Sequence, residues 1–129
     1  MRVTMAVIPL CHYTTVSLYG DGRTHQLDIF QKVININGTL HFGGTTGLKD
    51  LKCFKNLKSI RSEGHGIVLL YNSEFNSLYL PSLKLISHPK KAKAAIMYNN
   101  PGFHSNDFIA KMKKIGVKET SMLYEEGKG

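Results

Sequence analysis

Histidine and cysteine are the side chains of this sequence best suited to bind a metal or to attack a substrate. The six histidines and two cysteines are His12, His25, His41, His65, His88, His104, Cys11 and Cys53. Their spacing matches neither a zinc site nor the two-histidine motif of a metalloprotease helix. The chain also lacks the glycine patterns of a nucleophile elbow, a phosphate-binding loop or a dinucleotide site. The sequence therefore predicts no enzyme, no metal and no cofactor.

Lysines are the next group whose chemistry could bind a ligand. The net charge is +8, from 17 lysines and arginines against 9 aspartates and glutamates. One cluster consists of Lys90, Lys91, Lys93, Lys111, Lys113, Lys114 and Lys118. Specific nucleic-acid binding normally adds arginine or aromatic contacts to bases, and the three arginines (Arg2, Arg23 and Arg61) lie outside this cluster. We therefore interpret the cluster as a solvated face and predict no nucleic-acid partner.

The elements that position these side chains follow an internal repeat. Leu57 recurs as Leu83 in the next copy, and Phe42, Leu69 and Met97 occupy one position of three successive copies. Each copy starts with a short apolar alternation and continues with leucines two or three positions apart. A repeat of this length is typical of a solenoid whose coils each carry strands. The sequence thus predicts one domain of α/β or mainly β class.

Three segments follow from the repeat. Residues 27–103 hold the repeats themselves. Residues 1–26 are expected to form a partial N-terminal coil or a truncated cap, with a strand at Val16 to Tyr19. Residues 104–129 are expected to form a capping helix and a tail.

The expected helix covers residues 107–115. Its N-cap would be Ser105, Asn106 or Asp107, and Gly116 would end it. Its apolar stripe would cover the end of the solenoid core, which would otherwise be exposed.

The N-terminus is a poor match to a secretion signal. Its apolar run is short and is interrupted by Thr4 and Pro9, and no small-residue cleavage site follows cleanly. A strand or a truncated start is favoured instead. No apolar run approaches the ~18 residues of a membrane span, so we expect no membrane-spanning helix in this chain.

Four degenerate leucine-rich motifs occur in order between residues 27 and 103. They are Phe30-x-x-Val33-x-x-Ile36-Asn37-Gly38-Thr39-Leu40, Leu51-x-x-Phe54-x-Asn56-Leu57-x-x-Ile60, Leu78-x-Leu80-Pro81-Ser82-Leu83-x-x-Ile86 and Asn99-Asn100-Pro101. In these motifs the chain resembles the receptor L domain of the insulin-receptor and epidermal-growth-factor-receptor families, and especially nematode proteins with that domain. The resemblance implies a right-handed, leucine-rich-like β-helix of short parallel strands with a capping helix. It also implies an extracellular or cell-surface module that binds a protein or peptide ligand without catalysis.

The chain departs from the family pattern at two cysteine positions. Cys11 lies about where the second cysteine of an N-terminal cystine would fall, and no cysteine precedes it. His104 stands where the family commonly has a cysteine. Asn37-Gly38-Thr39 is the one N-glycosylation sequon, and it weakly supports a secreted ancestry.

The repeat also predicts which strand residues face outward. The side chains expected in the core are those of Leu40, Phe42, Ile67, Leu69, Ala95 and Met97. Because neighbours along a strand point to opposite faces, we expect a largely apolar outer face for ligand binding. Its members would be His41, Val68, Leu70, Ile96 and Tyr98. Two alternatives stay open: a terminal segment covers this face, or the register slips by one residue in one copy.

Three polar or reactive side chains are expected to be structural. Cys53 aligns with Leu80 of the next copy and is predicted to be a buried thiol. Asn72 and Asn100 recur at one repeat position and are predicted to form hydrogen bonds with backbone groups at the coil turns.

The resulting hypothesis is that the chain is a non-catalytic ligand-binding module. The alternatives are an intracellular leucine-rich structural or interaction protein that binds acidic partners, and a fragment of a longer receptor-like chain.

Overall fold

Parallel β-sheets form the framework of the chain. The computed structural model describes residues 15–20, 31–46 and 48–125. Sheet A holds, in spatial order, β1 (Thr15–Gly20), β3 (Thr39–Thr45), β6 (Ile67–Leu70), β9 (Ala95–Tyr98) and β10 (Met122–Tyr124). Sheet B holds β2 (Asn35–Asn37), β5 (Ser59–Arg61) and β8 (Leu85–Ser87), and sheet C holds β4 (Asp50–Leu51) and β7 (Ser77–Leu78). Within these ranges, parallel strands with one α-helix agree with the predicted α/β or mainly β class.

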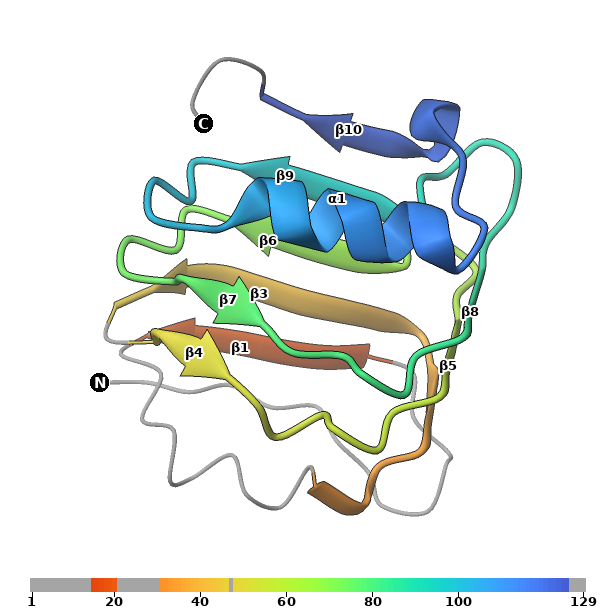
Figure 1. Ribbon diagram of the computed structural model, residues 1–129, viewed down its shortest axis with the longest axis horizontal. Helices are drawn as coiled ribbons and strands as arrows, with labels where there is room; N and C mark the ends of the chain where they lie inside the picture. Colours follow the sequence, from red (N-terminus) through yellow and green to blue (C-terminus); the bar gives the residue numbers. More distant parts are fainter. Residues whose placement is uncertain (1–14, 21–30, 47, 126–129) are drawn as a thin grey trace.

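The chain passes through the three sheets in a fixed order. The first round consists of β2, β3 and β4, and the second of β5, β6 and β7. The third round begins with β8 and β9 and then forms the helix α1 (Ser105–Lys114) where a strand of sheet C would come next. Figure 1 shows sheet A behind, β4, β7 and α1 in front of it, and sheet B along one side. A short 3-10 helix (Glu119–Ser121) then leads into β10, which pairs with β9.

Sheet A is organised in rows of paired residues that cross neighbouring strands. Leu40 pairs with Ile67, Ile67 with Ala95 and Ala95 with Met122, and none of the four is more than 6% exposed. The predicted inward-facing residues Leu40, Phe42, Ile67, Leu69, Ala95 and Met97 are all buried. The prediction of which strand residues face the core is therefore confirmed in all three copies.

Five phenylalanines pack in succession through the core. Phe42 contacts Phe54 and Phe75 with ring centroids 6.3 and 6.0 Å apart. Phe75 stacks on Phe103 at 5.1 Å, and Phe103 meets Phe108 of α1 at 5.7 Å. Aromatic pairs at such distances add to the energy of area burial. The same series joins β3 to α1, so the helix belongs to the same core as the sheets.

A residue with a left-handed backbone conformation lies near the end of each pass through sheet A. Gly44, Tyr71 and Asn99 have φ angles of 64°, 57° and 56°. They occupy the same position in three successive rounds, so the repeat includes this backbone turn. In the first of these rounds β3 runs on to Thr45, so the positive φ is confined to Gly44.

The helix α1 begins earlier than the sequence predicts and has a different N-cap. Its first residue is Ser105, and His104 occupies the N-cap position without a side-chain hydrogen bond to the helix. The predicted caps Ser105, Asn106 and Asp107 are therefore wrong, because all three lie within the first turn. The cause is a tertiary bond: the His104 N–H donates to the Asn76 carbonyl at 2.8 Å, which fixes where the chain leaves the sheet.

The other end of α1 and the N-terminal strand agree with prediction. Gly116 follows the helix with a φ of 95°, and the next residue, Val117, donates its N–H to the Met112 carbonyl. The strand predicted at Val16 to Tyr19 lies within β1. Cys11 lies outside the described residues. No helix in the described ranges is long and apolar enough to cross a bilayer.

Candidate binding surfaces

The outer face of sheet A is the first candidate surface. His41 pairs with Val68, Val68 with Ile96 and Ile96 with Leu123, so one row crosses four strands. The row alternates with the buried row of Leu40, and its residues therefore face away from the core. Four of the five predicted site residues, His41, Leu70, Ile96 and Tyr98, are partly exposed. The face is thus accessible and, apart from His41 and the Tyr98 hydroxyl, apolar.

Val68 contributes less to this surface than its position suggests. It is 8% exposed, although it stands in the outward row. Its small side chain is flanked by His41 on one strand and Ile96 on the other, and such lateral neighbours shield a short side chain. Val68 therefore adds little accessible surface to this face.

Leu123 is a member of the row that sequence reasoning missed. It lies in β10, opposite Ile96, and is 43% exposed. The repeats predicted from the sequence end at residue 103, and the segment that follows is predicted to form a helix and a tail. A signal was nevertheless present, because Met122 follows Ala95 at the same spacing as Leu69 follows Phe42 and so continues the repeat.

His41 is the one titratable side chain of the row. Burial lowers the pKa of His41 below its ordinary value of 6.5. Desolvation favours the neutral imidazole. The face therefore carries no charge from this residue at neutral pH, which suits a largely apolar contact.

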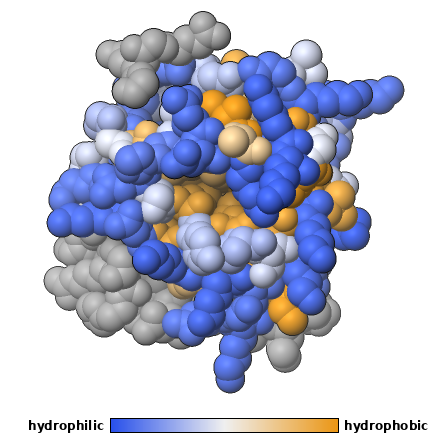
Figure 2. Space-filling model, in the orientation of Figure 1, coloured by the Kyte–Doolittle hydropathy of each residue, from blue (hydrophilic) through white to orange (hydrophobic). Residues whose placement is uncertain are grey.

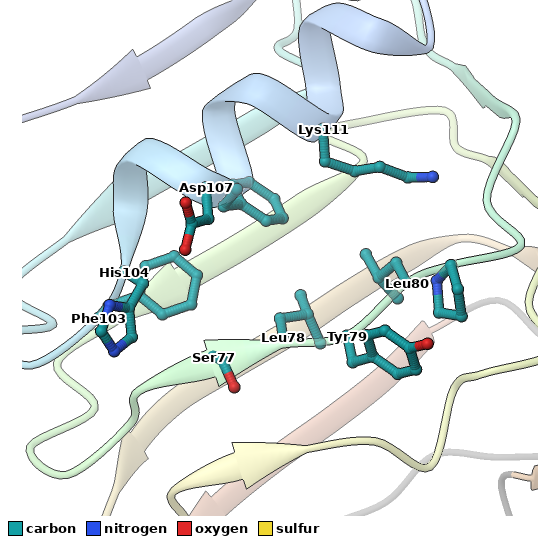
Figure 3. A pocket seen from close by; sticks show the side chains of 10 residues that line it. Ser77, Leu78, Tyr79, Leu80, Phe103, His104, Asp107 and Lys111 are labelled. Atoms are coloured by element: carbon teal, nitrogen blue, oxygen red, sulfur yellow. The ribbon is translucent and has the colours of Figure 1, made fainter.

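A second surface lies between β7 and α1, on the side of the molecule opposite the outer face of sheet A. It is a groove of about 320 Å³, lined by Ser77, Leu78, Tyr79, Leu80, Pro81, Phe103, His104, Asp107, Phe108 and Lys111. Figure 2 shows an apolar hollow near the centre of this side, surrounded by hydrophilic residues. In Figure 3 the labelled side chains of β7 and of α1 line the two walls. The sequence did not reveal the groove, because it forms where a helix replaces the third strand of sheet C.

Asn37, the predicted glycan acceptor, is exposed at the end of β2. The Thr39 hydroxyl of the same sequon donates to the His65 carbonyl at 2.7 Å. An exposed asparagine at the end of a short strand leaves room for a glycan. Whether it carries one stays a prediction.

The remaining candidates are scattered or buried. In the described part of the chain no three histidine, cysteine, aspartate or glutamate side chains come close enough to hold a metal ion. Cys53 is buried within the core, as predicted. Of the lysine cluster, Lys90, Lys91, Lys113, Lys114 and Lys118 are exposed. Lys113 lies 3.6 Å from Glu119, a solvent-exposed ion pair of little energetic weight.

Comparison with known proteins identifies a family. No curated protein and no solved structure is significantly similar to the chain. The family model described as Receptor L domain matches residues 12–116, which include β1, all three rounds and α1. The match spans most of the chain and agrees with the motifs and the parallel sheets described above. The chain therefore belongs to the receptor L domain family.

Proposed function

We propose that this chain is a non-catalytic module that binds a protein or peptide ligand through the outer face of sheet A. Receptor L domains form a ligand-binding family without catalytic activity. The observation that carries the proposal is the outward row from His41 to Leu123, whose partly exposed side chains are mostly apolar. Contiguous apolar surface that stays accessible usually marks an interaction site.

We further infer that the three rounds form a right-handed solenoid. Parallel strands of one sheet are joined by right-handed connections in nearly all proteins, and the path of the chain in Figure 1 supports that hand here. Residues 27–103 would then be the repeats, and residues 104–129 would close one end. The burial of Phe108, Ile109 and Met112 supports a capping role for α1, because these side chains belong to the same core cluster as the buried residues of the sheets.

The binding proposal can be tested with paired substitutions on the face. Leu70→Ser and Tyr98→Ser remove two accessible apolar side chains of neighbouring strands, and Leu85→Ser on sheet B is a matched control at an exposed leucine. A labelled, multimerised form of the chain would be screened against an array of extracellular proteins and peptides. We expect the sheet A variants to lose the bound ligands while the control keeps them. Equal binding by all variants, or a large loss of thermal stability in the sheet A variants alone, would contradict a binding face.

The same proposal places the protein outside the cell or on its surface, since receptor L domains are typically extracellular. Expression with its own N-terminus in animal cells, followed by mass spectrometry of Asn37, tests this setting. A secreted protein with a glycan on Asn37 supports it. Retention in the cytosol without a glycan would exclude it.

Unpaired lysines support a second candidate function, an intracellular interaction module for acidic partners. Lys90, Lys91, Lys114 and Lys118 are exposed, and none of them forms an ion pair within the described ranges. This function would show as binding that weakens steeply with salt and is lost on neutralising these lysines. Binding through sheet A would instead be nearly insensitive to salt.

A further inference from the structure

We propose that the groove between β7 and α1 binds an extended acidic peptide of a partner protein, which pairs with β7 as a third strand of sheet C. This site is separate from the outer face of sheet A. It rests on an open strand edge, an apolar floor beside that edge, and the charge at the rim.

The strand edge is open because α1 replaces the strand that would continue sheet C. On the β4 side, Asn76 and Tyr79 donate their N–H groups to the carbonyls of Lys49 and Leu51 at 2.7 and 2.9 Å. On the α1 side, this segment accepts one backbone hydrogen bond, which the His104 N–H donates to the Asn76 carbonyl. Leu78 lies between residues that bond toward β4, so its own N–H and C=O point toward α1. An unpaired edge of this kind is a template for another strand.

The space beside this edge suits alternating apolar side chains. The floor and walls include Leu78, Leu80, Phe103 and Phe108, and the groove volume is about 320 Å³. That volume lies near the lower end of the roughly 300–1,000 Å³ found for ligand pockets. In an extended peptide, every second side chain would enter the groove while the backbone pairs with Leu78. Backbone pairing would supply affinity and the apolar side chains specificity.

The rim favours an acidic peptide. Lys111 of α1 lines the groove and has no carboxylate within ion-pair distance among the described residues. Lys113 and Lys114 lie in the same last turn of the helix, and the chain as a whole carries a charge of +8. Asp107, one turn before Lys111, is the single acidic side chain in the lining. A glutamate or aspartate next to the apolar residues of the peptide would therefore meet Lys111.

A random heptapeptide library displayed on phage, panned against the purified chain, provides the probe. We expect enriched peptides with apolar residues at alternate positions and an acidic residue next to them. Each amide of the best synthetic peptide would then be N-methylated in turn. Methylation of the one amide that donates to the Leu78 carbonyl should weaken binding about tenfold or more, since this change removes a backbone hydrogen bond and introduces a clash, while the neighbouring amides tolerate it. No enrichment, or a scan in which no single amide is sensitive to methylation, would overturn the proposal.

Substitutions in the protein separate this site from the other surfaces. Lys111→Glu should weaken binding of the acidic peptide about 3- to 10-fold, whereas Lys114→Glu, in the same turn but outside the groove lining, should change it little. Leu70→Ser and Tyr98→Ser should leave peptide binding unchanged, so the failure of one site does not imply failure of the other. Equal effects of Lys111→Glu and Lys114→Glu would contradict the site. So would dimerisation of the chain that blocks the peptide, because a second copy would then occupy the groove.

Discussion

Asn72 and Asn100 are joined by a side-chain hydrogen bond that connects two successive rounds of the chain. Asn72 donates from Nδ2 to Oδ1 of Asn100 at 2.7 Å, and its own Oδ1 accepts the Thr45 hydroxyl at 2.6 Å. Each asparagine also donates to a carbonyl of the preceding strand in sheet A, Asn72 to Phe42 at 3.1 Å and Asn100 to Leu69 at 2.9 Å. The predicted structural role of the two asparagines is confirmed. These hydrogen bonds form an asparagine ladder, which connects the turns between sheets A and C in successive rounds.

Removal of the Asn72 side-chain amide should strongly destabilise the fold. Asn72 is 0% exposed, so Asn72→Ala leaves the Phe42 carbonyl and the Thr45 hydroxyl without these partners in a dry site. We expect the free energy of unfolding to fall by about 3 kcal/mol or more, because several buried groups lose hydrogen bonds together. Urea unfolding measures this change. The control is Asn106→Ala at an exposed position of α1, and a similar small effect of both variants would contradict the ladder's role.

Tyr71 is held in a backbone conformation that suits another residue better. Its φ is 57° and its side chain is 63% exposed, while Gly44 and Asn99 occupy the equivalent positions of the other rounds. Left-handed backbone costs a bulky residue about 1–2 kcal/mol, and asparagine tolerates it better. Tyr71→Asn should therefore raise the free energy of unfolding by about 0.5–1 kcal/mol.

The matched control for this change is Tyr79→Asn. Tyr79 is also exposed, but it does not have a positive φ. Thermal unfolding of the two variants separates relief of backbone strain from loss of exposed aromatic surface. If Tyr71→Asn destabilises the protein as much as Tyr79→Asn does, the strain at residue 71 is negligible.

These turn positions show what local sequence could and could not reveal. The inward residues from Leu40 to Met97 follow from period-two alternation, which is a local pattern, and it held in every round. Gly44 is a recognisable turn residue, but Tyr71 has no such signature, and only its spacing from Gly44 connects the two. The conformation at Tyr71 depends on the bond from its N–H to the Tyr98 carbonyl and on the asparagine ladder that follows.

The same distinction between local pattern and tertiary contact applies to the two candidate surfaces. The outer face of sheet A could be predicted, because a strand that buries one set of side chains must present the other. Its extent could not, since the shielding of Val68 and the addition of Leu123 depend on which strands lie beside each other. The groove depends on the position where α1 replaces a strand. That position is set by the bond between His104 and Asn76, two residues with no local pattern in common.

Gly66 is required for close packing between rounds. A Cβ at this residue would lie 2.5 Å from Cγ2 of Ile86 and 2.6 Å from the Ala94 carbonyl oxygen. Gly66→Ala should therefore lower the free energy of unfolding by about 1–3 kcal/mol, as overpacking does in tightly packed cores. Gly64→Ala is the control, because its nearest neighbour would be 4.0 Å away.

A double variant refines this prediction. Ile86→Ala removes one of the two clashing atoms but leaves the Ala94 carbonyl, which accepts the Ile67 N–H at 2.9 Å. In a double-mutant cycle with Gly66→Ala, we expect a partial rescue. A full rescue would show that the side-chain clash alone is responsible, and the backbone contact would then be unimportant.

His41 should make stability depend on pH. Its folded-state pKa is lowered by burial below 6.5. Between that lowered pKa and 6.5 the unfolded chain binds more protons than the folded chain, so stability rises with pH across this window. Conversely, stability is lost as pH falls below 6.5, and the loss is complete below the folded-state pKa.

His41→Gln removes this titration from the outer face of sheet A. We expect the plot of unfolding free energy against pH, measured by urea denaturation between about pH 7 and about pH 5, to be flatter for the variant than for the native chain. If His41→Gln keeps the native slope, burial does not lower the pKa of His41. The burial of His41 in the outer face of sheet A would then not favour the neutral imidazole.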